Sequence, residues 1–270
     1  MDYFNLSKKV VVITGAGGLL GQRHAEAVAE YGAYPVLIDI QEQTIKKLAP
    51  QLSEKFKIKS LAITADITSE ESLLQAKEKI IAEFGEIDVL INNAAHNPQP
   101  NESHDFRFEN LDLKVWEQHL SVGLTGAFLC AKIFGVEIAK NKEGGSIINI
   151  SSDLGLIAPD QRLYAENTNE PNQKNVKPVT YSVVKTGLIG LTRYLATYWP
   201  KEKVRCNALC PGGVYNQQDE NFVKKVSQLI PLGRMADVDE YKGSIVFLCS
   251  KASSYMTGSI LAIDGGRTSW

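Results

Sequence analysis

Short runs of β-branched apolar residues alternate along the chain with longer segments in which apolar residues recur every three or four positions. The short runs have the length of buried strands and the longer segments that of amphipathic helices. The expected strands are Val10–Thr14, Pro35–Asp39, Ser60–Ala65, Val89–Asn92, Ser146–Ser151, Val204–Leu209 and Ile260–Asp264. The expected helices are Leu20–Tyr31, Gln41–Lys55, Glu70–Phe84, Lys114–Lys140, Val179–Tyr198 and Val238–Ser250. This alternation predicts an α/β fold, a doubly wound parallel sheet of about seven strands with helices on both faces.

The 270 residues show no shift in composition that would mark a linker, so we expect a single domain spanning 1–270. Two polar stretches, 96–112 and 157–178, interrupt the alternation, and each follows the carboxyl end of an expected strand. Ligands of open α/β sheets bind outside these ends, which makes both stretches candidate substrate loops. The alternative is that they are passive surface insertions.

Composition narrows the class of protein. Hydrophobic residues make up 44% of the chain, enough for a sizeable core, and the formal net charge of −2 at pH 7 gives no basic footprint for nucleic acid or an anionic membrane. The four cysteines lie in apolar segments without metal-ligand spacing, so we expect reduced core residues and no metal. Neither a signal peptide nor a membrane-spanning apolar run is evident, which favours a cytoplasmic protein.

A glycine-rich turn joins the first expected strand to the first helix. Its residues are Thr14-Gly15-Ala16-Gly17-Gly18-Leu19-Leu20-Gly21. Glycines at such a turn let the backbone approach a pyrophosphate, and the helix N-terminus offers free N–H groups to its charge. The second strand ends at Asp39, whose carboxylate can accept the hydroxyls of an adenosine ribose and repel a 2′-phosphate. This pairing favours NAD over NADP, although Asp39 could also act as a helix cap.

A second set of polar residues suits proton transfer. Tyr181 and Lys185 are four positions apart at the start of an expected helix, which places both on one face. The ammonium favours ionisation of the phenol and makes Tyr181 a plausible acid and base for an alcohol or carbonyl. Ser152 follows a central strand, where its hydroxyl could polarise the substrate oxygen.

Taken in this order, these segments resemble the short-chain dehydrogenase/reductase family over nearly the whole chain. Further matching segments are Asp66-Ile67, Asn92-Asn93-Ala94-Ala95, Asn207–Gly213, Thr257-Gly258 and Asp264-Gly265-Gly266. The resemblance implies a Rossmann fold, NAD(P)-dependent oxidoreductase activity and a Ser152, Tyr181 and Lys185 catalytic set. The cofactor-binding residues that we expect are Gly15, Gly17, Gly18, Leu20, Gly21, Asp39, Asp66, Ile67, Asn92, Ala94, Tyr181, Lys185, Pro211, Gly212 and Val214.

The chain departs from the family pattern at three points. Leu19 occupies the position of the middle glycine, and Gly123 replaces the Asn that is associated with a proton-relay water. Ser152 and Tyr181 are 29 residues apart, about twice the usual gap, because the polar stretch 157–178 lies between them. Tyr164 within that stretch has Thr168 rather than Lys four positions later, so Tyr181 is the better candidate for the base.

The polar stretch and the segment Gly213–Gln217 resemble a branch of the family found in bacterial surface-sugar pathways. This likeness points to a sugar or sugar-nucleotide alcohol, closed over by the stretch as a lid. The expected substrate-binding residues are His96, Gln161, Arg162, Asn216 and Gln217, with Glu166 and Asn167 as further lid residues. The alternative for these side chains is that they only face solvent.

The leading hypothesis is therefore an NAD-dependent oxidoreductase that acts on a small, polar, sugar-like molecule. Two alternatives are a related enzyme for another polar carbonyl compound and a catalytically silent dinucleotide-sensing or scaffold protein. The resemblance also implies a homo-oligomer, tetramer or dimer, for which Leu188, Leu191 and Leu195 could supply a contact stripe. These leucines could instead face the sheet of their own subunit.

Overall fold

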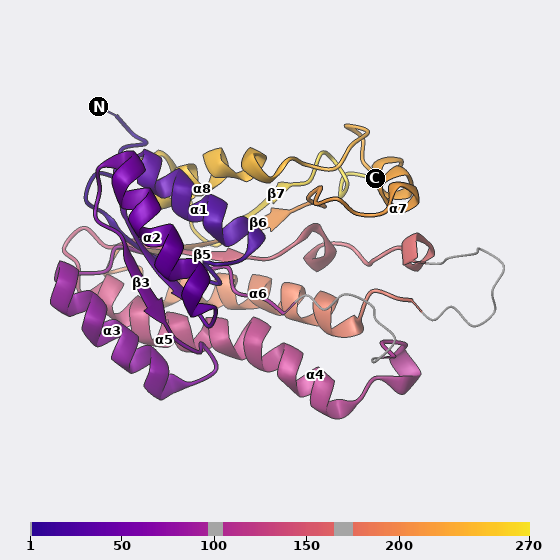
Figure 1. Cartoon of the computed structure of the whole chain (residues 1–270), viewed down its shortest axis with the longest axis horizontal. Coiled ribbons are helices and arrows are strands. Elements are labelled where there is room, and N and C mark those ends of the chain that lie inside the picture. The colour runs from indigo at the N-terminus through magenta and orange to yellow at the C-terminus, as the bar shows by residue number, and fades with distance from the viewer. Residues whose placement is uncertain (1, 97–104, 165–174) are drawn as a thin grey trace.

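The computed structural model describes residues 2–96, 105–164 and 175–270. Within these ranges one seven-stranded sheet has the order β3-β2-β1-β4-β5-β6-β7, and every neighbouring pair is parallel (Figure 1). The strands are β1 (Val10–Thr14), β2 (Tyr34–Asp39), β3 (Leu61–Thr64), β4 (Val89–Asn92), β5 (Gly145–Ile150), β6 (Val204–Pro211) and β7 (Ile260–Ile263). The order reverses between β1 and β4, which confirms the predicted doubly wound Rossmann fold.

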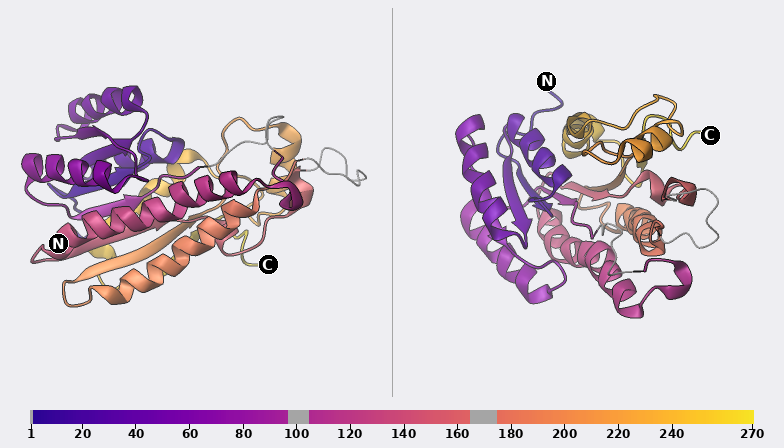
Figure 2. Two further views of the ribbon diagram at one scale, coloured as in Figure 1. Left: turned by 90° about the horizontal axis from the view of Figure 1, so that it is seen from below. Right: turned by 45° about the vertical axis from the view of Figure 1, so that its right-hand side comes forward.

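Helices cover both faces of the sheet (Figure 2). They are α1 (Leu19–Glu30), α2 (Glu42–Phe56), α3 (Glu70–Phe84), α4 (Leu113–Leu120), α5 (Gly126–Ala139), α6 (Val179–Tyr198), α7 (Glu220–Ser227) and α8 (Lys242–Cys249). Because successive strand residues point to opposite faces, Val10 and Val12 pack with α3, α5 and α6, whereas Val11 and Ile13 pack with α1, α2 and α8. The continuous apolar runs of the sequence follow from this double burial.

The expected helix over 114–140 is a helical run from Leu113 to Ala139 in which Ser121–Thr125 form a π-helical turn. The run is long and apolar enough to cross a membrane, but most of its apolar part is buried inside the protein. It is therefore a core helix of the fold. The four cysteines are free and buried, as the apolar segments around them predict.

Two expectations about helices need correction. Helix α7 is absent from the sequence-based prediction, and it begins where the Asp219 side chain accepts hydrogen bonds from the N–H groups of Asn221 and Phe222. The leucines suggested as an intersubunit stripe face the interior of their own subunit, since Leu188 and Leu195 are buried and Leu191 packs against the core cluster that contains Leu195. The exposed large apolar side chains of α6 are instead those of Val183, Tyr194 and Tyr198.

His24 of α1 is fully buried, and neither ring nitrogen hydrogen-bonds to a described residue. Burial lowers the pKa of His24 to about 3, so the imidazole is neutral in the folded protein. The unfolded chain binds a proton there below a pH of about 6.5. Because the unfolded state then holds more protons than the folded state, stability is lost as the pH falls from about 6.5 toward 3.

We predict that His24→Leu reduces the acid sensitivity of the fold. Between pH 7.5 and pH 5.0 the imidazole accounts for a loss of about 2 kcal/mol in the free energy of unfolding, and the variant lacks this contribution. Urea unfolding of both proteins at the two pH values measures the difference. An equal pH dependence in wild type and His24→Leu would contradict the assignment.

Candidate active site

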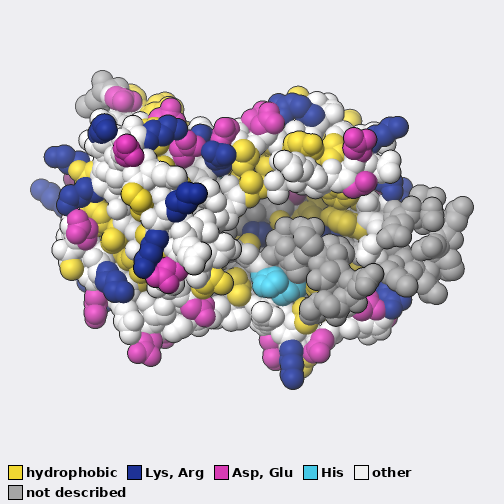
Figure 3. All heavy atoms as spheres, viewed as in Figure 1, with side chains coloured by type: hydrophobic (Ala, Val, Ile, Leu, Met, Phe, Trp, Pro, Cys, Tyr) yellow, Lys and Arg dark blue, Asp and Glu magenta, His cyan; other side chains and the backbone are white. Residues whose placement is uncertain are grey.

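A cavity of about 820 Å³ lies at the carboxyl ends of the strands, where the strand order reverses. The space-filling view shows this hollow on one face of the molecule (Figure 3). Its lining runs from the glycine turn after β1 to the start of α6 and the segment that follows β6. An apolar wall is supplied by the cluster that joins Leu163 to α7 and Met235. The fold thus places this cavity where open α/β sheets bind ligands.

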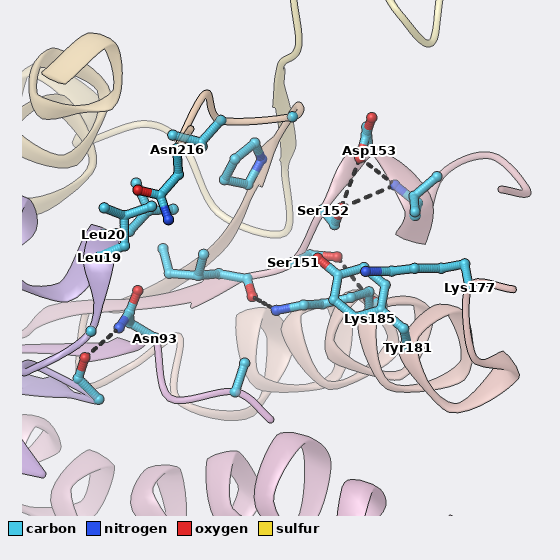
Figure 4. A pocket seen from close by; sticks show the side chains of 18 of the residues that line it. Leu19, Leu20, Asn93, Ser151, Ser152, Asp153, Lys177, Tyr181, Lys185 and Asn216 are labelled. Atoms are coloured by element: carbon cyan, nitrogen blue, oxygen red, sulfur yellow. Dashed lines mark hydrogen bonds between the residues drawn. The ribbon is translucent and has the colours of Figure 1, made fainter. Parts of the chain in front are cut away.

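The glycine turn is built for close approach. Gly15 has a φ of 62°, and a Cβ there would lie 2.7 Å from the Cα of Ala94. A Cβ on Gly21 would lie 2.1 Å from the carbonyl oxygen of Gly15, so α1 can pack on the turn only without a side chain there. Leu19 opens α1 and its half-exposed side chain lines the cavity (Figure 4). The first turn of α1 still offers its free N–H groups to an anion.

Asp39 lines the cavity from the carboxyl end of β2. Its Oδ2 accepts a hydrogen bond from Gly17 N at 2.8 Å and its Oδ1 one from Gln41 N at 2.9 Å. The carboxylate therefore steadies the glycine turn and the start of α2 while it also lines the cavity. Among the described lining residues the basic ones are Lys177, Lys185 and Arg267, and none comes from the β2 end. The β2 end of the cavity thus carries a carboxylate and no basic side chain among the described lining residues.

The remaining residues expected to bind a cofactor fall into two groups. Those that line the cavity are Gly18, Leu20, Asp66, Ile67, Ala94, Pro211, Gly212 and Val214. Asn92 lies one layer deeper, where its Nδ2 donates to the carbonyl of Ala127 and to Asn149 Oδ1. Gly17 and Gly21 likewise shape the turn from beneath the cavity. The structure thus separates residues that could touch a dinucleotide from residues that hold its site in shape.

Ser152, Tyr181 and Lys185 meet at the end of β5, and all three line the cavity (Figure 4). Lys185 Nζ donates to the carbonyl oxygen of Ile150 at 2.8 Å. Ser151 Oγ donates in return to the carbonyl oxygen of Lys185 at 2.7 Å. Lys185 Nζ also lies 5.7 Å from the ring centroid of Tyr181. These two reciprocal bonds fix α6 against the strand that carries Ser152.

Burial governs the proton affinities of these groups. It raises the pKa of Tyr181, while the hydrogen bond with Ser152 acts in the opposite direction. Burial, together with the positive charge of Lys177, lowers the pKa of Lys185 to about 8. Tyr181 therefore keeps its proton at neutral pH and can donate it.

Ser152 has a carboxylate neighbour that the sequence did not single out. Ser152 Oγ donates to Asp153 Oδ1 at 2.8 Å and accepts from Leu154 N at 3.2 Å. Burial raises the pKa of Asp153, and its hydrogen bonds with Ser152 and Leu154 oppose this rise. Asp153 also lines the cavity, so it can accept a hydrogen bond from a hydroxyl group beside the reacting oxygen.

Tyr164 also lines the cavity, from a short 3₁₀ helix, Gln161–Tyr164. Its ring packs against Phe222 of α7, with the centroids 5.8 Å apart. Burial raises the pKa of Tyr164 to about 12. Tyr181 has Lys185 near its ring, and this charge favours ionisation of the phenol. This agrees with the sequence-based choice of Tyr181 as the base.

The expected substrate-binding residues are dispersed. Asn216 lines the cavity, whereas Gln217 does not, and its φ of 56° turns the chain so that Gln218 lines it instead. His96 lies in a small adjoining cavity, its ring stacked on His119 at 4.7 Å. Glu166 and Asn167 lie outside the described residues.

Gln161 and Arg162 have local partners. Gln161 accepts a hydrogen bond from Lys177 N and donates one to the carbonyl of the same residue. Arg162 is 83% exposed and forms an ion pair with Asp160 at 2.7 Å. Lys177 lines the cavity itself, and so does Arg267 from the C-terminal segment. The sequence did carry a signal for Lys177, since it precedes Tyr181 by the same four positions that separate Tyr181 from Lys185.

Gly123 is explained by the residue before Lys185. A Cβ on Gly123 would lie 2.5 Å from Val184 Cγ1, so Val184 fills the space that a side chain at position 123 needs. The π-helical turn Ser121–Thr125 is centred on this glycine. The departure from the family pattern at position 123 is therefore matched by the bulk of Val184.

Known proteins with similar sequences and structures are oxidoreductases. A family model described as enoyl-(acyl carrier protein) reductase matches residues 15–268. The NAD-dependent glycerol dehydrogenase of Listeria innocua is 32% identical, covering 98% of this chain and 96% of that protein. The 2-dehydro-3-deoxy-D-gluconate 5-dehydrogenase of Dickeya dadantii is 31% identical, covering 98% of both. The crystal structure of a gluconate 5-dehydrogenase from Burkholderia cenocepacia, in complex with NADP and tartrate, has a TM-score of 0.86 at 26% identity, covering 100% of this chain and 98% of that one.

We predict that Gly123→Ala destabilises the protein by about 1–3 kcal/mol, because the added methyl group overpacks against Val184. Val184→Ala in the same chain should restore most of this loss. A double-mutant cycle in urea unfolding measures the coupling between the two positions. Additive effects of the two substitutions would show that Val184 does not impose the glycine.

Proposed function

Since this chain belongs to the short-chain dehydrogenase/reductase family, we propose that it is an NAD-dependent oxidoreductase that interconverts an alcohol and a carbonyl on a small, polyhydroxylated, sugar-related substrate. The observation that carries the proposal is the meeting of Ser152, Tyr181 and Lys185 at one end of a cavity whose other end holds the glycine turn and Asp39. Retention of all three polar groups, with Tyr181 protonated, argues against a silent binding protein.

A bound nicotinamide dinucleotide supplies or accepts the hydride. The chain's own residues handle the proton and the reacting oxygen. In the reductive direction Tyr181 Oη gives its proton to the carbonyl oxygen as that oxygen becomes a hydroxyl group. The ammonium of Lys185 stabilises the resulting phenolate, and Ser152 holds the reacting oxygen. In the oxidative direction the same groups take the proton from the alcohol.

The class of substrate is supported by the relatives and by the cavity. The names of the relatives refer to glycerol and to sugar acids, all of which carry several hydroxyl groups. Asp153, Asn216 and Gln218 line the cavity and can hydrogen-bond such a molecule. The likeness of 157–178 to surface-sugar enzymes favours a sugar nucleotide, whereas these relatives favour a smaller polyol or sugar acid, which we propose here.

Two further proposals concern the whole protein. We place it in the cytoplasm, and we propose that it assembles as a homo-oligomer. The support for assembly is the exposure of large apolar side chains on the outer faces of two neighbouring helices, Phe128 of α5 and Tyr194 and Tyr198 of α6. Light scattering tests the assembly, and a monomer of about 30 kDa at micromolar concentration would reject it.

We predict that the protein binds NADH more tightly than NADPH and that Asp39→Asn narrows the preference by roughly tenfold, about 1.4 kcal/mol. The carboxylate charge that repels a 2′-phosphate is lost, while the amide oxygen can still accept a hydrogen bond from Gly17 or Gln41. Fluorescence titrations with both cofactors measure the ratio. Tighter binding of NADPH by the wild-type protein would refute the role of Asp39.

We predict that Tyr181→Phe lowers kcat by at least roughly 100-fold and leaves the Kd for NADH nearly unchanged, because the ring remains while the transferable proton is removed. Tyr164→Phe is the matched control, since Tyr164 lines the same cavity while its ring packs against Phe222 of α7, and its kcat should fall less than about tenfold. Turnover is measured with the best polyol or sugar acid found in a screen. If Tyr164→Phe were the more damaging change, the roles of the two tyrosines would be reversed.

A further inference from the structure

A second lysine lies against the reacting tyrosine. Lys177 Nζ is 3.8 Å from the ring centroid of Tyr181, closer than the 5.7 Å of Lys185 Nζ. Lys177 extends across the Tyr181 ring from the segment just before α6 and lines the cavity (Figure 4). Two lysines are thus presented to one tyrosine, and the second is not needed for the proton transfer described above.

The backbone of Lys177 is clamped. Gln161 Oε1 accepts from Lys177 N at 2.9 Å, and Gln161 Nε2 donates to the Lys177 carbonyl at 3.2 Å. Pro178 then caps α6, which fixes the direction in which the chain enters the helix. The side-chain amide of Gln161 thus hydrogen-bonds both the N–H and the carbonyl of Lys177, as the backbone of a neighbouring strand would. Gln161 is therefore a positioning residue for Lys177.

The surroundings of Lys177 favour an anionic ligand. Burial lowers its pKa to about 8, and the nearby charge of Asp153 acts in the opposite direction. Asp153 already accepts hydrogen bonds from Ser152 and Leu154. Arg267 lines the same cavity, and its charge lowers the pKa of Asp153. An ammonium group that lines a cavity can form a charge-assisted hydrogen bond with an anion bound there.

We propose that Lys177, with Arg267 as a second cation in the same cavity, binds a carboxylate of the substrate, so that the substrate is a small hydroxy acid or the corresponding oxo acid. This inference rests on the proposed function, because it places the carboxylate relative to the carbon that reacts beside Tyr181. Since Lys177 contacts the tyrosine ring itself, the carboxylate lies within a few bonds of that carbon. The diphosphate of a sugar nucleotide would lie farther away.

A competing role for Lys177 is to tune Tyr181. A cation over the face of an aromatic ring interacts with the electrons of that ring whatever the substrate is. Removal of Lys177 would then slow acidic and neutral substrates equally. Anion binding, by contrast, affects only substrates that carry the charge, and mainly through KM.

The experiment compares substrates that differ only in the carboxylate. The pairs are gluconate with sorbitol, 3-hydroxybutyrate with 1,3-butanediol, and lactate with 1,2-propanediol, and sorbitol 6-phosphate tests a phosphate as the anion. Each is oxidised with NAD by wild type, Lys177→Met, Lys177→Arg and Lys201→Met. Lys201 is an exposed lysine just beyond the far end of α6, so its substitution is a charge-matched control.

We expect wild type to prefer the acid of at least one pair by roughly tenfold or more in kcat/KM. Lys177→Met should cost the acid at least tenfold more than its neutral partner, chiefly by raising KM, and Lys177→Arg should recover part of the loss. Lys201→Met should match wild type. Equal losses on both members of a pair would assign the tuning role and overturn the inference. A preference for the neutral members, or for sorbitol 6-phosphate over every carboxylate, would also overturn it.

Calorimetry separates this inference from the proposed function. The same acids are titrated into the NADH-loaded wild type and Lys177→Met proteins, with no turnover required. Binding that is weakened in Lys177→Met alone supports the carboxylate site even where no hydride transfer occurs. Absence of binding by every acid at millimolar concentrations would reject the site. Turnover of the neutral members alone would in that case leave the oxidoreductase proposal standing.

Discussion

The site depends on the pair of hydrogen bonds that joins the end of β5 to α6. The ammonium of Lys185 donates a hydrogen bond to the carbonyl oxygen of Ile150, and the hydroxyl of Ser151 donates one to the carbonyl oxygen of Lys185. Both bonds are buried, so a break would leave polar groups without water and would be costly. The segment after β5 is held equally tightly, because a Cβ on Gly155 would lie 3.0 Å from the backbone of Lys185. The positions of Ser152 and Tyr181 follow from this one junction.

The other end of the cavity is fixed by a similar polar junction between β1 and β4. Asn93 Nδ2 donates to the carbonyl oxygens of Thr14 and Gly15, and Thr14 Oγ1 accepts from the N–H groups of Asn93 and Ala94. These bonds hold the glycine turn against the neighbouring strand at the point where the strand order reverses. Thr14 and Asn93 thus serve mainly to shape the glycine turn, and Gly15 lets the turn approach the backbone of Ala94.

The sequence predicted what local periodicity and backbone geometry determine. Seven strands could be located from continuous apolar runs, because they are buried on both faces, and six helical segments from apolar residues at helical spacing. Helix α7 could not, because it has eight residues of which Val226 is the buried one, so its stability comes from contacts with Leu163 and Met235. The sequence also could not predict whether Leu188 faces its own subunit or another, because an apolar stripe on a helix does not identify the surface that covers it.

The difference between features set by local spacing and features set by distant contacts also explains which site residues could be predicted. Tyr181 and Lys185 lie on one helix face, so their spacing brings them together, whereas Ser152 joins them from the end of β5, as the family resemblance implied. Lys177 shares that helical spacing, but its place over the Tyr181 ring depends on Gln161, a residue 16 positions earlier in a stretch without regular period. The long sequence gap between Ser152 and Tyr181 thus has a structural consequence. The hydrogen bonds between the end of β5 and α6 are kept despite the insertion. The end of the inserted stretch places Lys177, held by Gln161, over the Tyr181 ring. The insertion therefore changes what can bind beside Tyr181 without altering the groups that move the proton.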